Sequence, residues 1–168
     1  MGSARHTRAI DDETITFSDE PADHDPGRAL VLAMEAEIVD IYRDREQRPH
    51  NPVLDELAGE GGALVVVRVG GEPAGCAGLK RIDEEAAEIK RVFIKPEFRG
   101  RGIGRPLIAA VERRARELGY RRVRLDTGHE QPEARHIYET SGYHSIERFN
   151  DAPFAAFWFE KELEPPPA

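Results

Sequence analysis

The feature that most constrains the fold of this chain is a glycine- and arginine-rich loop, "RGRGIGRP", at residues 99–106. A run of strand-forming residues, 91–95, precedes the loop, and apolar residues recur at helical spacing over 103–118 after it. Glycines at such a junction let successive backbone N–H groups converge on one point, and the N-terminus of the following helix adds a partial positive charge there. The segment therefore predicts a strand–loop–helix unit that holds an anion such as a phosphate.

Charge is unevenly distributed along the chain. Residues 90–124 contain twelve Lys or Arg and three Asp or Glu, although the whole chain carries a net charge of −8. A nucleic-acid partner would need a basic surface overall or aromatic stacking positions, and the sequence has neither, so we expect no nucleic acid. For the individual arginines, a solvated helix face with intrahelical ion pairs is an equally good interpretation.

Length and composition predict one domain. A chain of 168 residues that is 39% hydrophobic can bury a core of its own. We expect a flexible N-terminal tail at 1–12, a single domain at 13–163 and a disordered tail at 164–168. No apolar run reaches the roughly 18 residues of a membrane span, and the N-terminus lacks the apolar stretch of a signal peptide, so a cytoplasmic protein without a membrane partner is expected.

The order of expected elements is mixed. We expect strands at 14–17, 63–69, 74–82, 84–95, 121–127, 143–149 and 154–163, with helices at 28–47, 103–118 and 132–142. Because the first strands are largely adjacent and helices are interleaved with them, the order predicts an α/β fold of the mixed α+β kind. Its centre would be a single mixed, mostly antiparallel, twisted sheet of six to seven strands flanked by helices.

Two motifs make the stretch from Ala87 to Tyr143 resemble the GNAT superfamily of acetyl-CoA dependent N-acetyltransferases. The family signature R/Q-x-x-G-x-G/A is matched by Arg99, Gly102 and Gly104. The downstream pattern N-x-x-A-x-x-x-Y-x-x-x-G-F/Y is matched at Ala134, Tyr138, Gly142 and Tyr143, whereas Gln131 stands where Asn is usual. One motif alone is weak, but both at this separation are strong, and they imply a GNAT-like fold.

Two other phosphate-binding motifs fit the loop less well. A dinucleotide-binding fingerprint would find its ribose-binding acid in Asp126, but Leu107 and Arg105 occupy the two alternative positions for the third glycine. A P-loop needs Gly-Lys-Ser/Thr at the helix start, and Gly104 is followed by Arg105 and Pro106 instead. Acetyl-CoA is therefore the expected cosubstrate.

The resemblance also implies which residues bind the coenzyme. Backbone N–H groups of the loop from Arg99 to Arg105 would receive the pyrophosphate, and the pantetheine arm would lie between the strand ending at Ile94 and the one beginning near Arg122. Glycines at 102 and 104 would let the backbone approach the phosphates. The full expected set is Val92, Phe93, Ile94, Arg99, Gly100, Arg101, Gly102, Ile103, Gly104, Arg105, Gln131 and Tyr138.

Catalysis of acetyl transfer to an amine requires a base, an oxyanion donor and a proton for the leaving thiolate. By resemblance, Glu88 is the candidate base and Tyr138 the candidate acid, with a backbone N–H near Phe93 or Ile94 as oxyanion donor. Each has a simpler interpretation: Glu88 as an exposed strand carboxylate or as the partner of Lys90 or Arg91, and Tyr138 as a core aromatic residue. A non-catalytic acyl-CoA-binding or sensing module would need neither residue.

The acceptor is less well defined by the sequence. Acidic stretches such as "SDEPADHD" and "RIDEEAAE" suggest an acidic cleft for a cationic small-molecule primary amine, although a protein lysine or N-terminus is the alternative. The resemblance makes His24 and Glu37 candidates to line this cleft, with solvated surface as the alternative for each, and a homodimer is left open.

Other reactive residue types suggest no further chemistry. Cys76, the single cysteine, excludes an intrachain disulfide and is interpreted as a buried strand residue rather than a nucleophile. The spacing of His129, His136 and His144 matches no usual zinc pattern, so no metal is expected.

Overall fold

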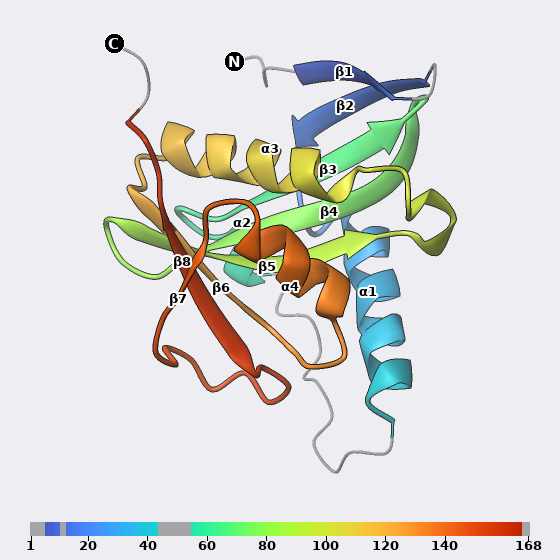
Figure 1. Cartoon of the computed structure of the whole chain (residues 1–168). Coiled ribbons are helices and arrows are strands. Elements are labelled where there is room, and N and C mark those ends of the chain that lie inside the picture. Colours follow the sequence, from blue (N-terminus) through green and yellow to red (C-terminus); the bar gives the residue numbers. More distant parts are fainter. Residues whose placement is uncertain (1–5, 11–12, 44–54, 166–168) are drawn as a thin grey trace.

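The computed structural model describes residues 6–10, 13–43 and 55–165 of the chain. Within these residues, eight strands form one sheet in the order β1-β2-β3-β4-β5-β6-β8-β7 (Figure 1). The strands are β1 (His6–Ile10), β2 (Glu13–Asp19), β3 (Ala63–Val69), β4 (Glu72–Arg81), β5 (Ala86–Ile94), β6 (Arg122–Thr127), β7 (His144–Ser145) and β8 (Phe157–Glu162). Neighbouring strands are antiparallel except β5 and β6, which are parallel.

Helices cover both faces of the sheet (Figure 1). They are α1 (Gly27–Ile41), α2 (Asp55–Ala58), α3 (Gly104–Glu117) and α4 (Pro132–Glu139), with a 3-10 turn at Pro96–Phe98. In β3, Leu64 and Val66 belong to the apolar cluster under α1, whereas Val65 and Val67 belong to the cluster under α3. A strand buried on both faces needs an unbroken apolar run, which explains the sequence "ALVVV".

The predicted fold class is confirmed, although the sheet in the described part of the chain has eight strands instead of the expected six to seven, and three local differences have physical causes. Residues His6–Ile10, expected in a flexible tail, form β1 by pairing with β2. The short helix α2 was not predicted because one turn carries no periodicity, although its Leu57 is buried. The strand expected over 143–149 shrinks to β7 because the chain leaves the sheet after Ile146, whose N–H donates to the Trp158 carbonyl.

Two helix boundaries also differ from the prediction. The helix expected over 28–47 begins at Gly27 and ends at Ile41, and residues 44–54 lie outside the described part of the chain. The helix expected over 132–142 ends at Glu139, followed by Gly142 with a φ of +89°. That left-handed conformation favours glycine and ends the helix.

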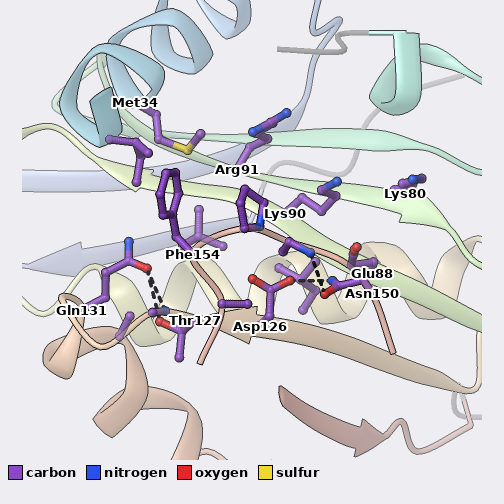
Figure 2. A pocket seen from close by; sticks show the side chains of 18 of the residues that line it. Met34, Lys80, Glu88, Lys90, Arg91, Asp126, Thr127, Gln131, Asn150 and Phe154 are labelled. Atoms are coloured by element: carbon purple, nitrogen blue, oxygen red, sulfur yellow. Dashed lines mark hydrogen bonds between the residues drawn. The ribbon is translucent and has the colours of Figure 1, made fainter. Parts of the chain in front are cut away.

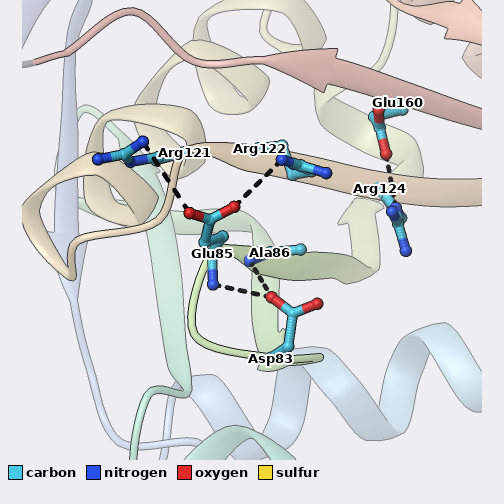
Figure 3. Close-up of polar contacts among 7 residues, drawn as sticks. All are labelled: Asp83, Glu85, Ala86, Arg121, Arg122, Arg124 and Glu160. Carbon is cyan, nitrogen blue, oxygen red and sulfur yellow. Dashed lines mark hydrogen bonds and ion pairs between the residues drawn. The ribbon is translucent and has the colours of Figure 1, made fainter.

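A polar cluster ties together one end of the parallel β5–β6 pair (Figure 3). Asp83 Oδ1 accepts hydrogen bonds from the N–H groups of Glu85 and Ala86, each 2.8 Å long, and so shapes the β4–β5 turn. The Glu85 carbonyl accepts from the N–H groups of Arg121 and Arg122, and its carboxylate lies 3.2 Å from the Arg122 guanidinium. These contacts hold the start of β5 against the start of β6.

The other end of the β5–β6 pair is open. Pairing stops at Glu88 and Arg124, so the remaining residues of β5 and β6 do not pair with each other. A bulge lies just beyond: the register against β4 shifts between Cys76 and Gly78, and Arg91 has a φ of +57°. Bulges bend and twist the strand that carries the extra residue. The Cys76 thiol, 3.3 Å from the Arg91 carbonyl, donates a hydrogen bond to the bulge.

A buried charged cluster fastens α3 to the sheet. Glu112 of α3 is 5% exposed and accepts hydrogen bonds from Lys161 Nζ at 3.0 Å and from the Tyr143 hydroxyl at 3.1 Å. Removing one member of a buried pair leaves the other charge without compensation. This cluster therefore holds α3, whose N-terminus follows the glycine loop, at a fixed place on the sheet.

We predict that Glu112→Ala lowers the free energy of unfolding by about 3 kcal/mol, because Lys161 loses its carboxylate in a partly buried position. The double variant Glu112→Leu with Lys161→Met should recover most of this loss. Glu117→Gln, on the exposed side of the same helix, serves as the control and should change stability by less than about 0.5 kcal/mol. Urea unfolding measures all three, and equal effects of Glu112→Ala and Glu117→Gln would contradict the prediction.

Candidate active site

A cavity of about 470 Å³ lies where β5 and β6 part (Figure 2). Its walls come from α1, β5, β6, α4 and the loop between β7 and β8. In that loop, the Phe154 ring stacks on the Tyr42 ring at the end of α1, with centroids 4.1 Å apart and planes at 9°. The stack joins two segments that are distant in the sequence and closes one side of the cavity.

Glu88 lines this cavity at the last position of β5 that pairs with β6. The residue is 5% exposed, and its Oε2 has no hydrogen-bond partner among the described residues. Burial raises the pKa of the Glu88 carboxyl, and Asp126 raises it further, whereas Lys90, Lys80 and a hydrogen bond from Asn150 lower it. A buried carboxylate oxygen without a donor is well suited to accept a proton.

Asp126 provides a second carboxylate, from β6 on the other side of the opening. Its Oδ2 accepts a 2.7 Å hydrogen bond from Asn150 Nδ2 (Figure 2). Burial raises the pKa of Asp126, against the lowering effects of the Asn150 hydrogen bond and of Lys90. Asn150 Oδ1 in turn accepts from Trp158 Nε1 at 2.9 Å and from the Ala152 N–H at 3.3 Å.

Tyr138 lines the same cavity from α4. Its ring packs against Tyr143 and Phe159, with centroids 5.7 and 6.3 Å away. Burial, and secondarily the charge of Asp126, raise the pKa of the Tyr138 phenol, so it stays protonated at neutral pH. The two side chains predicted to be catalytic, Glu88 and Tyr138, therefore line the same cavity.

The glycine loop has the backbone geometry of an anion site. Gly100 and Gly102 have φ values of +77° and +74°, where other residues are strained, and a Cβ at either would meet nothing within 4 Å. The helix α3 begins at Gly104, so the N–H groups of its first turn have no partner within the helix. At Gly104, a Cβ would lie 2.8 Å from Ile137 Cδ1, so this glycine also allows α4 to pack closely against the start of α3.

The loop arginines are engaged with protein groups. The Arg99 guanidinium binds both carboxylate oxygens of Glu37, at 2.6 and 2.7 Å, and the Ile94 carbonyl at 2.9 Å. Arg101 pairs with Glu13 at 3.2 Å, and Arg105 donates to the hydroxyls of Thr140 and Ser141. These contacts connect the loop to α1, β2 and the end of α4.

Neither residue expected to line an acceptor cleft lies in the cavity wall. Glu37 is held by Arg99 beside the loop, and His24 is exposed, with Nδ1 2.8 Å from Asp23 Oδ1. The expected acidic character is also absent, because acids and bases are equal in number among the described lining residues. These are Glu88, Asp126 and Asp151 against Lys80, Lys90 and Arg91.

The remaining predicted coenzyme residues divide into two groups. Val92 and Gln131 line the cavity, and Gln131 Oε1 lies 3.3 Å from Thr127 Oγ1 and 3.4 Å from the Gly128 nitrogen. The Phe93 side chain is buried under α1, and Ile94 packs against the α3 side of the core. Gln131 thus steadies the turn between β6 and α4.

Sequence reasoning missed three cavity residues. Asp126 was considered only as a ribose-binding acid, although a carboxylate next to the end of a strand was a usable signal. Asn150 and Phe154 lie in an irregular loop: Asn150 follows the strand expected over 143–149, and Phe154 was placed in the strand expected over 154–163, whereas β8 begins at Phe157. Their position follows from the hydrogen bonds and ring contacts of the folded chain.

Other reactive groups stay outside the site. Cys76 is fully buried, and burial raises the pKa of its thiol to about 12, which removes it as a nucleophile at neutral pH. Within the described residues, no three His, Cys, Asp or Glu side chains are grouped to hold a metal ion. None of the described helices is long and apolar enough to cross a membrane.

Comparisons with known proteins agree with this geometry. The family model described as "Acetyltransferase (GNAT) family" matches residues 31–143. An IAA acetyltransferase of Azospirillum brasilense is 30% identical over 131 residues, covering 77% of this chain and 84% of that protein. A solved structure from Klebsiella pneumoniae, described as an acyl-CoA N-acyltransferase, superposes with a TM-score of 0.71 and 27% identity over 89% of this chain and 98% of that one. A GNAT acetyltransferase of Elizabethkingia anophelis, solved with acetyl-CoA bound, has a TM-score of 0.63 and 20% identity over 89% of this chain and 98% of that one.

Proposed function

Because the chain belongs to the GNAT family of acetyltransferases, we propose that it transfers the acetyl group of acetyl-CoA to the primary amine of a small molecule. The observation that carries this proposal is a cavity at the β5–β6 opening that has both Glu88 and Tyr138 in its wall. A carboxylate able to accept a proton and a phenol able to donate one are what acetyl transfer to an amine requires.

The residues of the site fit acetyl-CoA. Beyond Glu88, backbone groups of β5 lack a partner on β6, and an extended pantetheine arm can pair with them as a strand would. The loop from Arg99 to Arg105 offers converging N–H groups and a helix N-terminus to the pyrophosphate. When bound, the coenzyme supplies an activated acetyl thioester, and the N–H of Phe93 or Ile94 is the proposed donor to the developing oxyanion.

The protein side chains would then handle the protons. An alkylamine has a pKa of about 10.4, so at neutral pH only about one molecule in a thousand is uncharged. Glu88 takes the first proton from the ammonium, which frees the nitrogen lone pair to form the C–N bond as the C–S bond breaks. Tyr138 gives its proton to the departing sulfur, and the second amine proton restores the phenol. One proton is left on Glu88 and returns to solvent.

The size and enclosure of the cavity favour a small acceptor. Its volume is about 470 Å³, and the Tyr42–Phe154 stack walls one side. Since acids and bases balance around it, long-range attraction of cations contributes little, and recognition of the amine depends on the nearby carboxylates of Glu88 and Asp126.

We predict that small primary amines are acetylated at least tenfold more efficiently, by kcat/KM, than lysine in peptides of ten residues, because the cavity wall limits access of a chain. Free-thiol release and mass spectrometry of the product measure both reactions. Raising the salt concentration should change the preference little. Peptides that outperform small amines would contradict the small-molecule assignment.

We predict that Gly102→Ala weakens acetyl-CoA binding by about tenfold or more, since a side chain at positive φ forces the loop to rearrange its N–H groups. Gly119→Ala is the matched control: it also changes a glycine of positive φ in open space, at the other end of α3. Both variants should lose about 1 kcal/mol of stability, but only Gly102→Ala should lose affinity in calorimetry. Gly104 is a poorer probe, because a side chain there collides with Ile137. Equal affinities of the two variants would place the pyrophosphate elsewhere.

We predict that Tyr138→Phe lowers kcat by about 10²-fold or more and changes the KM for acetyl-CoA less, because the phenol acts on the leaving sulfur. Wild-type turnover in this variant would mean that Tyr138 is a packing residue only.

We predict that Glu88→Gln lowers kcat/KM for the amine most at low pH and progressively less as the pH approaches the pKa of the amine. The loss of kcat/KM is expected to shrink as the pH rises because a base is needed only while the amine is protonated. A loss of kcat/KM that is the same at every pH would contradict the role of Glu88 as the base.

A further inference from the structure

We propose that Asn150 is a positioning residue that holds the Asp126 carboxylate across the cavity from Glu88, so that the acceptor's ammonium is received by two carboxylates instead of one. The inference rests on the proposed function and adds to it the residues that recognise the amine. Asn150 would touch neither the acceptor nor the coenzyme and would act through Asp126, and also directly on Glu88, whose pKa its hydrogen bond lowers.

The orientation of the Asn150 amide is determined by its neighbours. Its Oδ1 accepts hydrogen bonds from Trp158 Nε1 at 2.9 Å and from the Ala152 N–H at 3.3 Å. An indole N–H can only donate, so the oxygen must face Trp158 and the NH₂ must face Asp126. A flipped amide would set N–H against N–H and oxygen against carboxylate. The loop between β7 and β8 is thereby connected to the end of β6 by a defined chain of donors and acceptors.

The two carboxylates approach the cavity from different strands. Glu88 is paired in register with Arg124, and Asp126 lies two residues further along β6, so both side chains are on the same face of the sheet. Glu88 Oε2 is buried and lacks a hydrogen-bond partner, whereas Asp126 Oδ2 is occupied by Asn150. The negative charges of two partly desolvated carboxylates in one cavity repel each other, and a cation between them stabilises the ionised form of both.

These observations assign different tasks to the two acids. Asp126, whose pKa the Asn150 hydrogen bond lowers against the raising effect of burial, binds the ammonium, and Glu88 Oε2 accepts its proton. Asn150 suits this arrangement because a neutral amide donates a hydrogen bond without adding a charge. The other titratable or charged groups around the pair are Lys80 of β4, Lys90 and Arg91 of β5, Arg124 of β6, Tyr138 of α4, Tyr42 after α1 and Asp151 of the loop.

Two substitutions at Asn150 test the proposal, each in the full-length protein. Asn150→Leu removes the hydrogen bonds at similar size, and the nearly isosteric Asn150→Asp replaces the donor with a third carboxylate. Both substitutions should raise the pKa values of Asp126 and Glu88. These pKa values are measured by ¹³C NMR of the side-chain carboxyls in the free protein. Both should also move the acid limb of kcat/KM to higher pH and raise the KM for a small amine about tenfold, as expected for one lost charge-assisted contact.

Trp158 supplies an independent readout, because it is the single tryptophan of the chain. Its indole N–H resonance should shift upfield in Asn150→Leu, where the acceptor is lost. Trp158→Phe, which keeps a ring but removes the N–H, should move the acid limb in the same direction by a smaller amount. Glu147→Gln changes an exposed carboxylate in the same loop and is the control that should leave the titrations and the KM unchanged.

The outcomes separate the inference from the function on which it rests. Carboxyl titrations and a KM that stay at wild-type values in both Asn150 variants would overturn the role of Asn150 while leaving amine acetylation intact. A wild-type protein that acetylates no amine would overturn the proposed function and the inference with it. Upward shifts of both carboxyl pKa values together with a raised KM would support the two-carboxylate site.

Discussion

The structure of the site depends on the interruption of backbone pairing between β5 and β6. These parallel strands are tied together at Ala86–Glu88, where the Glu85 cluster holds the start of both, and they part where the bulge at Arg91 bends β5. A continuous ladder would leave neither a cavity nor free backbone groups for a ligand. Because the break comes directly after Glu88, the candidate base lies at the edge of the opening.

Local charges have more influence here than the net charge of the chain. The loop arginines, which made residues 90–124 look like a basic phosphate site, are engaged by Glu37, Glu13 and two hydroxyls. The acidic excess elsewhere likewise fails to make the cavity acidic, because Lys80 and Lys90 lie beside Glu88 and Asp126. We therefore attribute the proposed recognition of the coenzyme to backbone N–H groups of the loop. We attribute the proposed recognition of the acceptor to the carboxylates of Glu88 and Asp126.

Most of the sheet and helix order could be predicted from the sequence, because apolar periodicity and glycine or proline at element ends are local signals. The candidate roles of Tyr138 and Glu88 came from the resemblance to the GNAT family, and both side chains line one cavity. The bulge at Arg91 was not predictable, since a positive φ at a non-glycine residue depends on its tertiary surroundings. Asn150 and Phe154 were missed for the same reason: long-range contacts of an irregular loop bring them to the site.

The most direct test of the account is hydrogen exchange of the backbone with and without acetyl-CoA. If the coenzyme occupies the opening, amides of residues 91–94 and of the loop 99–105 should gain protection when it binds. Amides of residues 86–88, already paired with β6, should exchange at the same rate in both states. Protection that appears elsewhere, or none in these two segments at saturating acetyl-CoA, would contradict the claim that the β5–β6 opening is the coenzyme site.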